Sequence, residues 1–217
     1  MTHNSLKAVL FTLDHRLKRT EKLANAAYRW STASTTFLVH LPKFTAVHRD
    51  MVVEAAYLQA FIAWEAFLEE SFVLYICGKR LPRQRNLRCL CTMRTRAQAE
   101  NFITPEGKEY AEWTKTTIVT NRAIRFFEGG RPYTNALRPH QSKLDNMRFI
   151  RNAIAHASKY SQEKFQEIVR NELKTLPPRL TIGGFLITVK PHSSPPTTFL
   201  EDYLSYLRLM SQQIIPI

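Results

Sequence analysis

The sequence is poor in cysteine and glycine, and it has no long apolar run. It holds three Cys and six Gly in 217 residues. Cys77, Cys89 and Cys91 form no C-x2-C pair and have no His at zinc spacing, so we expect no structural zinc and no metal site. An odd number of cysteines without a secretory signal fits a reducing cytoplasm. No apolar stretch reaches about 18 residues without a charge, which predicts a cytoplasmic protein with no membrane span.

Signatures of nucleotide binding are also missing. The Gly129-Gly130 pair is not part of a G-x4-G-K-[ST] loop, and no strand precedes it. This excludes nucleotide hydrolysis by a phosphate-binding loop. The chain has no internal repeat and no low-complexity tract, and nothing in it indicates a cofactor.

Acidic residues are few relative to basic ones. The chain has 31 Lys and Arg against 18 Asp and Glu, a formal net charge of +13 and a pI of about 9.9. Such an excess favours a polyanionic partner, nucleic acid before an anionic membrane, although a merely soluble basic protein has the same composition. Hydrophobic residues make up 44% and aromatic residues 11%, as expected of a folded globule.

Hydrophobic spacing predicts a mainly α protein. We expect helices over residues 6–30, 49–78, 97–102, 106–127, 142–158, 161–174 and 197–213. Residues 180–189 are two β-rich runs joined by Gly183-Gly184, which predicts a small β-hairpin before the final helix. The length suits a single domain, 1–217, with a core at about 49–174 and an accessory hairpin and helix at 177–217.

The most informative helix is the one over residues 142–158. Ser142 followed by Asp145 resembles a capping box at its start. At 100° a residue, one arc of this helix is apolar and would pack; it holds Met147, Ile150, Ile154 and Ala157. The opposite arc is polar and holds Asp145, Arg148, Asn152 and His156. Arg151 lies about 140° from His156, at the border of the packing arc. One helix does not easily bring those two side chains together.

Two segments together carry a resemblance to a known family. Arg151-Asn152-Ala-Ile-Ala-His156 resembles the R-x4-6-H signature of the HEPN family, and the sequence A-W-E-A-F-L-E at 63–69 is similar to an early helix of that family. The likeness covers residues 53–157 best and is closest to the RiboL-PSP-HEPN subgroup. It implies a HEPN-like helical bundle.

The resemblance also implies an activity. Many family members are metal-independent endoribonucleases in which the motif helices of two protomers meet, so that Arg and His of both chains line one cleft. This implies a homodimer that cleaves RNA, with Arg151, Asn152 and His156 as catalytic residues. An imidazole suits proton transfer, and a guanidinium suits a charged phosphorane. Family members often act as toxins or in phage defence, which implies an antitoxin-like or regulatory partner.

Other residues have supporting roles in this hypothesis. Glu65 lies at the edge of an apolar stripe, where a carboxylate needs a cation, and Arg151 is its expected partner, the alternative being a solvated Glu65. Segment 79–96 has seven basic residues and no acidic one. The expected RNA contacts are Lys79, Arg80, Arg83, Arg85 and Arg88, together with Arg148 on the motif helix. The same basic run also fits a solvated surface.

Two other interpretations remain open. Without the family resemblance, residues 142–158 are a capped amphipathic helix whose polar side chains bond to their neighbours. With the resemblance, the chain also fits a catalytically silent HEPN module that binds RNA or protein.

Overall fold

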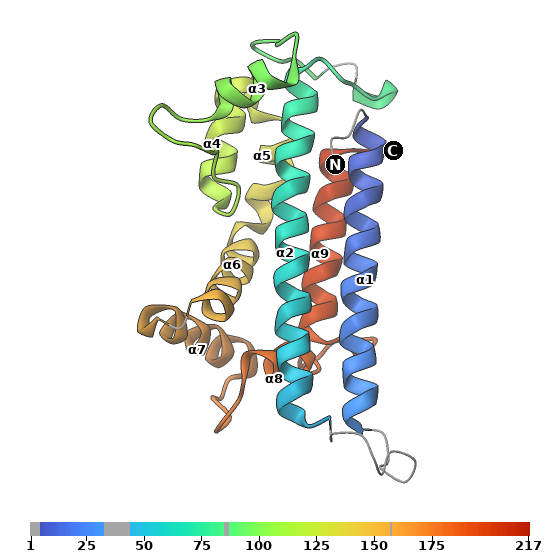
Figure 1. The fold of residues 1–217 in the computed structure, drawn as a ribbon, viewed down its shortest axis with the longest axis vertical. Helices are drawn as coiled ribbons and strands as arrows, with labels where there is room; N and C mark the ends of the chain where they lie inside the picture. Colours follow the sequence, from blue (N-terminus) through green and yellow to red (C-terminus); the bar gives the residue numbers. More distant parts are fainter. Residues whose placement is uncertain (1–4, 33–43, 85–86, 157) are drawn as a thin grey trace. The chain divides into compact units, whose positions relative to one another are not determined.

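The computed structural model describes residues 5–32, 44–84, 87–156 and 158–217. This part of the chain is mainly helical, as the hydrophobic spacing predicts (Figure 1). The helices are α1 (Leu6–Thr32), α2 (Ala46–Ile76), η2 (Pro82–Gln84), α3 (Arg96–Ile103), α4 (Thr116–Phe126), η3 (Glu128–Gly130), α5 (Tyr133–Leu137), η4 (Arg138–His140), α6 (Gln141–Ala155), α7 (Lys159–Leu173), α8 (Ile182–Ile187) and α9 (Phe199–Ile214).

The chain packs as two compact units, each assembled from segments far apart in sequence. Unit 1 comprises Met1–His15, Ile62–Arg148 and Tyr206–Ile217, and unit 2 comprises Arg16–Phe61 and Phe149–Ser205. Helices α1, α2, α6 and α9 each contribute residues to both units.

Unit 1 has an aromatic core around Phe72 on α2. Its ring lies 4.9 Å from that of Phe127 and 5.0 Å from that of Tyr133, which is fully buried. The Tyr133 and Ser71 hydroxyls are hydrogen-bonded at 2.9 Å. The Tyr75 hydroxyl donates to the carbonyl oxygen of Ile214 at 2.6 Å, which ties α2 to α9.

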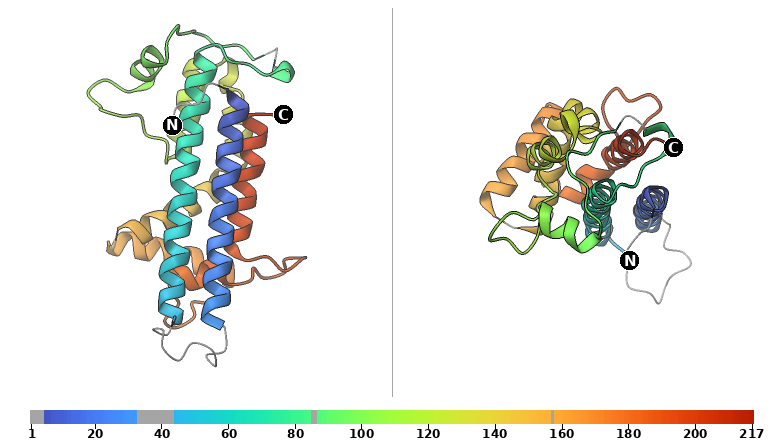
Figure 2. Two further views of the ribbon diagram at one scale, coloured as in Figure 1. Left: turned by 45° about the vertical axis from the view of Figure 1, so that its right-hand side comes forward. Right: turned by 90° about the horizontal axis from the view of Figure 1, so that it is seen from above.

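In unit 2, α1, α2 and α9 lie side by side (Figure 2). The Thr20 hydroxyl of α1 donates to the carbonyl oxygen of Ala56 on α2 at 3.4 Å. The ring of Tyr57 on α2 packs edge-on against that of Tyr203 on α9, with centroids 6.2 Å apart. These contacts explain why the long periodic helices form, because each buries one apolar stripe against its neighbours.

The predicted hairpin over residues 180–189 is wrong. Residues Ile182–Ile187 form α8, and the described residues contain isolated bridges but no strand. Thr181 starts the helix, because its hydroxyl oxygen accepts the Gly184 amide at 2.9 Å. The Gly183 amide donates to Glu54 of α2 at 2.9 Å. A β-rich composition reflects fit to a half-buried surface more than backbone preference, and here a cap and a carboxylate favour the helix.

α2 is long and apolar enough to cross a membrane by length and composition. Half of its most apolar stretch is buried within the protein. The core helix of a soluble protein can have the same length and composition. The fold is therefore compatible with a soluble protein.

Candidate functional site

α6 carries the HEPN-like motif, and its packing face largely follows the predicted arc. Met147 and Ile150 are buried, with 1% and 0% of their surfaces exposed, and Ile154 is half-buried. Ala157 lies outside the described residues. Ser142 does not cap the helix, because α6 begins at Gln141 and follows directly from η4.

Arg151, Asn152 and His156 lie together at the C-terminal end of α6, within unit 2. Arg151 Nη1 donates to Asn152 Oδ1 at 3.2 Å, and the His156 backbone amide donates to the Asn152 carbonyl oxygen at 2.8 Å. The His156 side chain is exposed and makes no hydrogen bond to any residue that the structure describes. The end of α6 therefore presents an exposed imidazole within two turns of a guanidinium that is bonded to an amide, and a guanidinium of this kind can bind an anionic oxygen.

The remaining residues predicted around the motif belong to unit 1. Arg148 Nε lies 3.6 Å from Asp145 Oδ1, so an ion pair along α6 engages this guanidinium. Glu65 is half-buried on α2. Because Glu65 belongs to unit 1 and Arg151 to unit 2, the expected ion pair between them stays a prediction.

The basic segment after α2 divides into structural and exposed side chains. Arg80 folds back on the end of α2, where Nη1 donates to the Tyr75 carbonyl oxygen at 2.6 Å and Nη2 to Cys89 Sγ at 2.9 Å. Arg80 is therefore engaged within the protein. Lys79 and Arg88 are exposed, and Arg88 lies 3.9 Å from Glu128 in a loose surface pair.

Two of the predicted RNA contacts have no described side chain. Arg85 lies outside the described residues, and of Arg83 only the backbone, in η2, is described. Their expected roles stay predictions.

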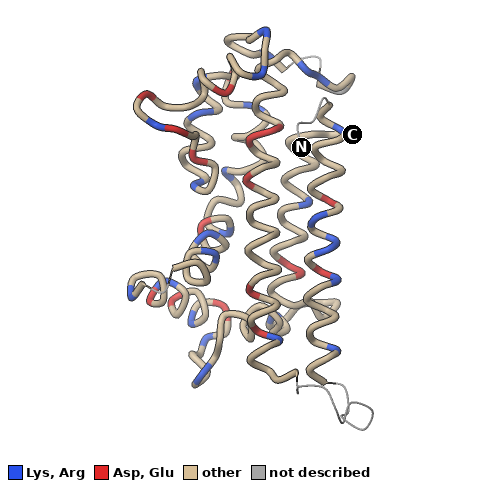
Figure 3. Tube along the Cα trace, viewed as in Figure 1, with Lys and Arg blue, Asp and Glu red and all other residues tan. Residues whose placement is uncertain are grey.

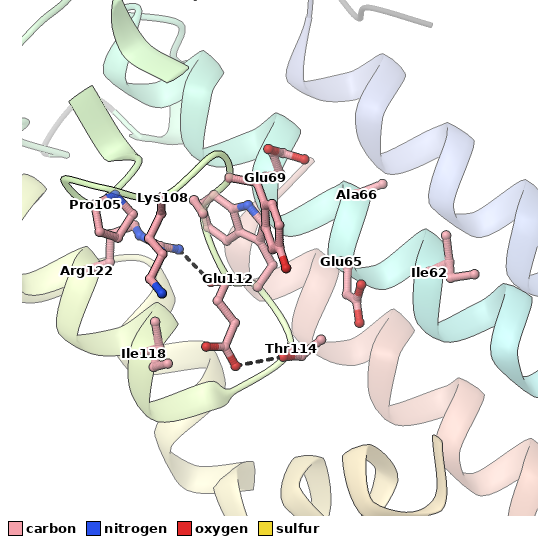
Figure 4. Close-up of a pocket in the computed structure, with 13 residues that line it drawn as sticks. Ile62, Glu65, Ala66, Glu69, Pro105, Lys108, Glu112, Thr114, Ile118 and Arg122 are labelled. Carbon is pink, nitrogen blue, oxygen red and sulfur yellow. Dashed lines mark hydrogen bonds between the residues drawn. The ribbon is translucent and has the colours of Figure 1, made fainter. Parts of the chain in front are cut away.

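Unit 1 also contains a cavity of about 830 Å³ that the sequence did not predict (Figure 4). Glu65 and Glu69 of α2 line it on one side. Trp113 and other residues of the segment between α3 and α4 line it on another, together with Arg122 of α4. These residues come from three separate stretches of sequence, so no local pattern identifies the cavity.

Burial shifts the pKa values of Arg122 and Glu69 in this cavity. The Arg122 guanidinium lies 4.4 Å from the centre of the Trp113 ring and donates to the Glu112 carbonyl oxygen at 2.9 Å. Burial lowers the pKa of Arg122, and the negative charges of Glu112 and Glu69 oppose that shift. Burial raises the pKa of Glu69, and the nearby Trp113 indole opposes the rise. The cavity suits a small molecule with polar groups and an apolar body.

No group of three His, Cys, Asp or Glu side chains converges as a metal site within the described ranges. Comparison with protein-family models, curated proteins and solved structures finds no match to this chain. The resemblance to the HEPN family therefore depends on residues 53–157 of the sequence alone.

Proposed function

We propose that the protein is a metal-independent endoribonuclease that acts as a homodimer through α6. The observation that carries the proposal is the end of α6, where the exposed His156 imidazole lies one helical turn from the bonded pair Arg151 and Asn152. The excess of basic residues supports RNA as the substrate.

The reaction needs proton transfer and charge stabilisation. The 2′-oxygen of the RNA attacks the adjacent phosphorus, a new P–O2′ bond forms, and the P–O5′ bond breaks. A His156 imidazole takes the 2′-hydroxyl proton, and a second, protonated imidazole gives a proton to the leaving 5′-oxygen. Arg151 binds the non-bridging oxygens as charge develops, and Asn152 orients Arg151. The products are a 2′,3′-cyclic phosphate and a 5′-hydroxyl.

The proposal requires a dimer because the reaction uses a second imidazole. Each motif contains one histidine, so two copies of α6 supply the acid and the base together. Within this proposal the protein acts in the cytoplasm as a toxin or phage-defence effector, restrained by an antitoxin-like partner.

Cleavage of a labelled RNA in the presence of EDTA tests the proposal. His156→Ala should lower the cleavage rate by about 10²- to 10⁴-fold and Arg151→Ala by about 10²- to 10³-fold, with helix content unchanged. His48→Ala and Arg170→Ala are matched controls, because both side chains are exposed and lie on other helices. Full activity in either motif variant, or a strictly monomeric active protein in light scattering, rejects the proposal. RNA binding without cleavage by the wild-type dimer favours the catalytically silent module.

A further inference from the structure

The exposed side of α1 within unit 2 carries several basic residues. α1 buries one side, with Leu10, Leu13, Leu17, Ala24 and Ala27 at most 6% exposed. At 100° a residue, the opposite half of α1 within unit 2 carries Arg19, Lys22 and Arg29, and Arg16 lies at one border of that half; all four are exposed. Asp14 and Glu21 fall at the border between the halves. We call Arg16, Arg19, Lys22, Arg29 and Trp30 the α1 face; Figure 3 shows Lys and Arg recurring along this helix.

The four cations of the α1 face are available to a ligand. None of them makes an ion pair with a residue in the part of the chain that the structure describes. The bordering carboxylate of Asp14 lies 3.5 Å from Arg208 Nε on α9. Arg16, Arg19 and Lys22 follow one another at about 4.5 Å along the helix axis, and Arg29 lies about 20 Å from Arg16. A row of this kind follows a phosphate backbone over several nucleotides.

Two neighbouring hollows lie along the same face. The first, of about 600 Å³, is lined by Arg16, Arg19, Lys22 and Leu23 of α1 and by Gln59 of α2. The second, of about 620 Å³, is lined by Lys22, Asn25, Arg29 and Trp30. Lys22 borders both. Each hollow has room for a nucleobase beside a cation that holds its phosphate.

Trp30 supplies a stacking surface at the end of the row. Its side chain is 62% exposed, and its ring lies 5.6 Å from that of Phe44, which supports it from one side. A supported and exposed indole is the group on which proteins that bind single strands stack bases.

The buried side of α1 argues against a lipid partner. A helix that lies in a membrane surface inserts its apolar side, but Leu13 and Leu17 of α1 are 2% and 0% exposed and pack inside the protein. Within unit 2, α1 lies on one side of α2 and the motif end of α6 on the other, so the two surfaces are separate (Figures 1 and 2).

We propose that the α1 face binds single-stranded RNA, with phosphates on Arg16, Arg19, Lys22 and Arg29 and a base stacked on Trp30. The choice of RNA over DNA rests on the proposed function. The α1 face then holds the strand at a distance from the cleavage site and contributes affinity rather than chemistry.

Binding of a fluorescent single-stranded oligoribonucleotide tests the α1 face. It is measured by anisotropy at several KCl concentrations, in the His156→Ala background so that no cleavage interferes. The α1 variant changes Arg16, Arg19, Lys22 and Arg29 to Gln. Losing four phosphate contacts should reduce the slope of log K against log salt by about 3, since each contributes about 0.7 on a single strand. At low salt the affinity should fall at least about tenfold.

A control variant removes the same number of charges elsewhere. Lys115, Arg125, Arg138 and Arg170 are exposed, and changing them to Gln gives the same net charge as the α1 variant. We expect its salt slope to change by less than about 1. Should the α1 variant fold poorly by circular dichroism, Arg16→Gln with Arg19→Gln should still reduce the slope by about 1.4.

Trp30 gives a second readout. Of the three tryptophans, Trp64 and Trp113 are 3% and 6% exposed, so RNA should quench mainly Trp30 fluorescence. Trp30→Leu should abolish the quenching and weaken binding by about 5- to 150-fold, the equivalent of one stacked base.

The outcomes separate this proposal from the nuclease. Unchanged affinity and salt slope in the α1 variant, or an equal loss in the control variant, overturns the α1 face. The proposal is also overturned if the α1 variant loses binding to phosphatidylserine vesicles while its RNA affinity is unchanged. RNA binding that depends on the α1 face, without cleavage by the wild-type protein, supports the face and rejects the nuclease. Cleavage by the wild-type protein, with no binding defect in the α1 variant, supports the nuclease and rejects the α1 face.

Discussion

Replacing Gly183 with Ala should destabilise the protein, because α8 touches the backbone of α2 at this residue. A Cβ at position 183 would lie 2.5 Å from the Asp50 Cα and 2.7 Å from the Asp50 carbonyl carbon. Both are backbone atoms inside a helix, so rotating a side chain cannot relieve the overlap. α8 would have to move away from α2, and the Gly183 amide would lose its bond to the Glu54 carboxylate.

Three effects set the magnitude. Overpacking costs about 1–3 kcal/mol, and losing a hydrogen bond to a charged group costs about 1.5–3 kcal/mol. The higher helix propensity of Ala relative to Gly stabilises the folded protein by about 1 kcal/mol. We therefore expect the free energy of unfolding to fall by about 2–5 kcal/mol, which lowers the Tm of a chain of this size by roughly 5–15 °C.

Differential scanning calorimetry of Gly183→Ala and Gly184→Ala provides the measurement. A Cβ at Gly184 would meet the Thr181 Oγ1 at 2.8 Å, a side-chain atom that can shift, at the cost of a helix cap worth about 0.5–2 kcal/mol. The second variant should therefore change Tm by only a few degrees. A Gly183→Ala protein within 1 °C or so of wild type would refute the close contact between α8 and α2, and with it the assignment of residues 182–187 as a helix in this position.

Two further substitutions test unit 1. Burial raises the pKa of Glu69, so its ionisation opposes folding at neutral pH. Glu69→Gln should raise Tm at about pH 7, and the gain should shrink as pH falls to the unfolded-state pKa of about 4.3; a gain independent of pH, or one shared by the exposed Glu109→Gln, contradicts this. Tyr133→Phe removes the buried hydrogen bond to Ser71 and should cost about 0.5–1.5 kcal/mol in chemical denaturation, whereas Tyr110→Phe, at a side chain 76% exposed, should cost nothing measurable.

The long helices could be predicted because their periodicity continues over many turns. α1, α2, α7 and α9 begin and end within three residues of the expected ranges. The structure buries most residues of their apolar stripes, with Leu23 of α1, 49% exposed, as an exception. Helix ends are less certain from sequence, as the start of α6 shows.

The predictions for short segments were wrong for local reasons. A helix was expected over residues 106–127, but α4 starts only at Thr116. Gly107 has a φ of +73° and Lys115 has an extended backbone, with φ −95° and ψ 114°, so neither position belongs to a helix. No helix was expected over residues 133–140, yet they form α5 and η4 and lead directly into α6. These are one- or two-turn elements, and their formation depends on tertiary contacts such as the burial of Tyr133 rather than on propensity.

The candidate site could be predicted in part. The sequence places Asn152 and His156 one turn apart, and the backbone bond between them agrees with that spacing. The bond from Arg151 to Asn152 was not predicted, because neighbouring residues on a helix point in different directions and only rotamers bring them together. The cavity of unit 1 was missed because its walls meet only in the folded chain.

The α1 face shows why charge in a sequence is hard to interpret. Basic residues every three or four positions on a helix usually mark a solvated side. Three structural facts change the meaning of the α1 face: the apolar side is buried, the bordering Asp14 pairs with Arg208, and hollows adjoin the cations. By contrast Arg80, which the sequence placed among the RNA contacts, bonds within the protein. Affinity for a polyanion therefore depends less on how many basic residues a segment has than on which of them the fold leaves without an internal partner.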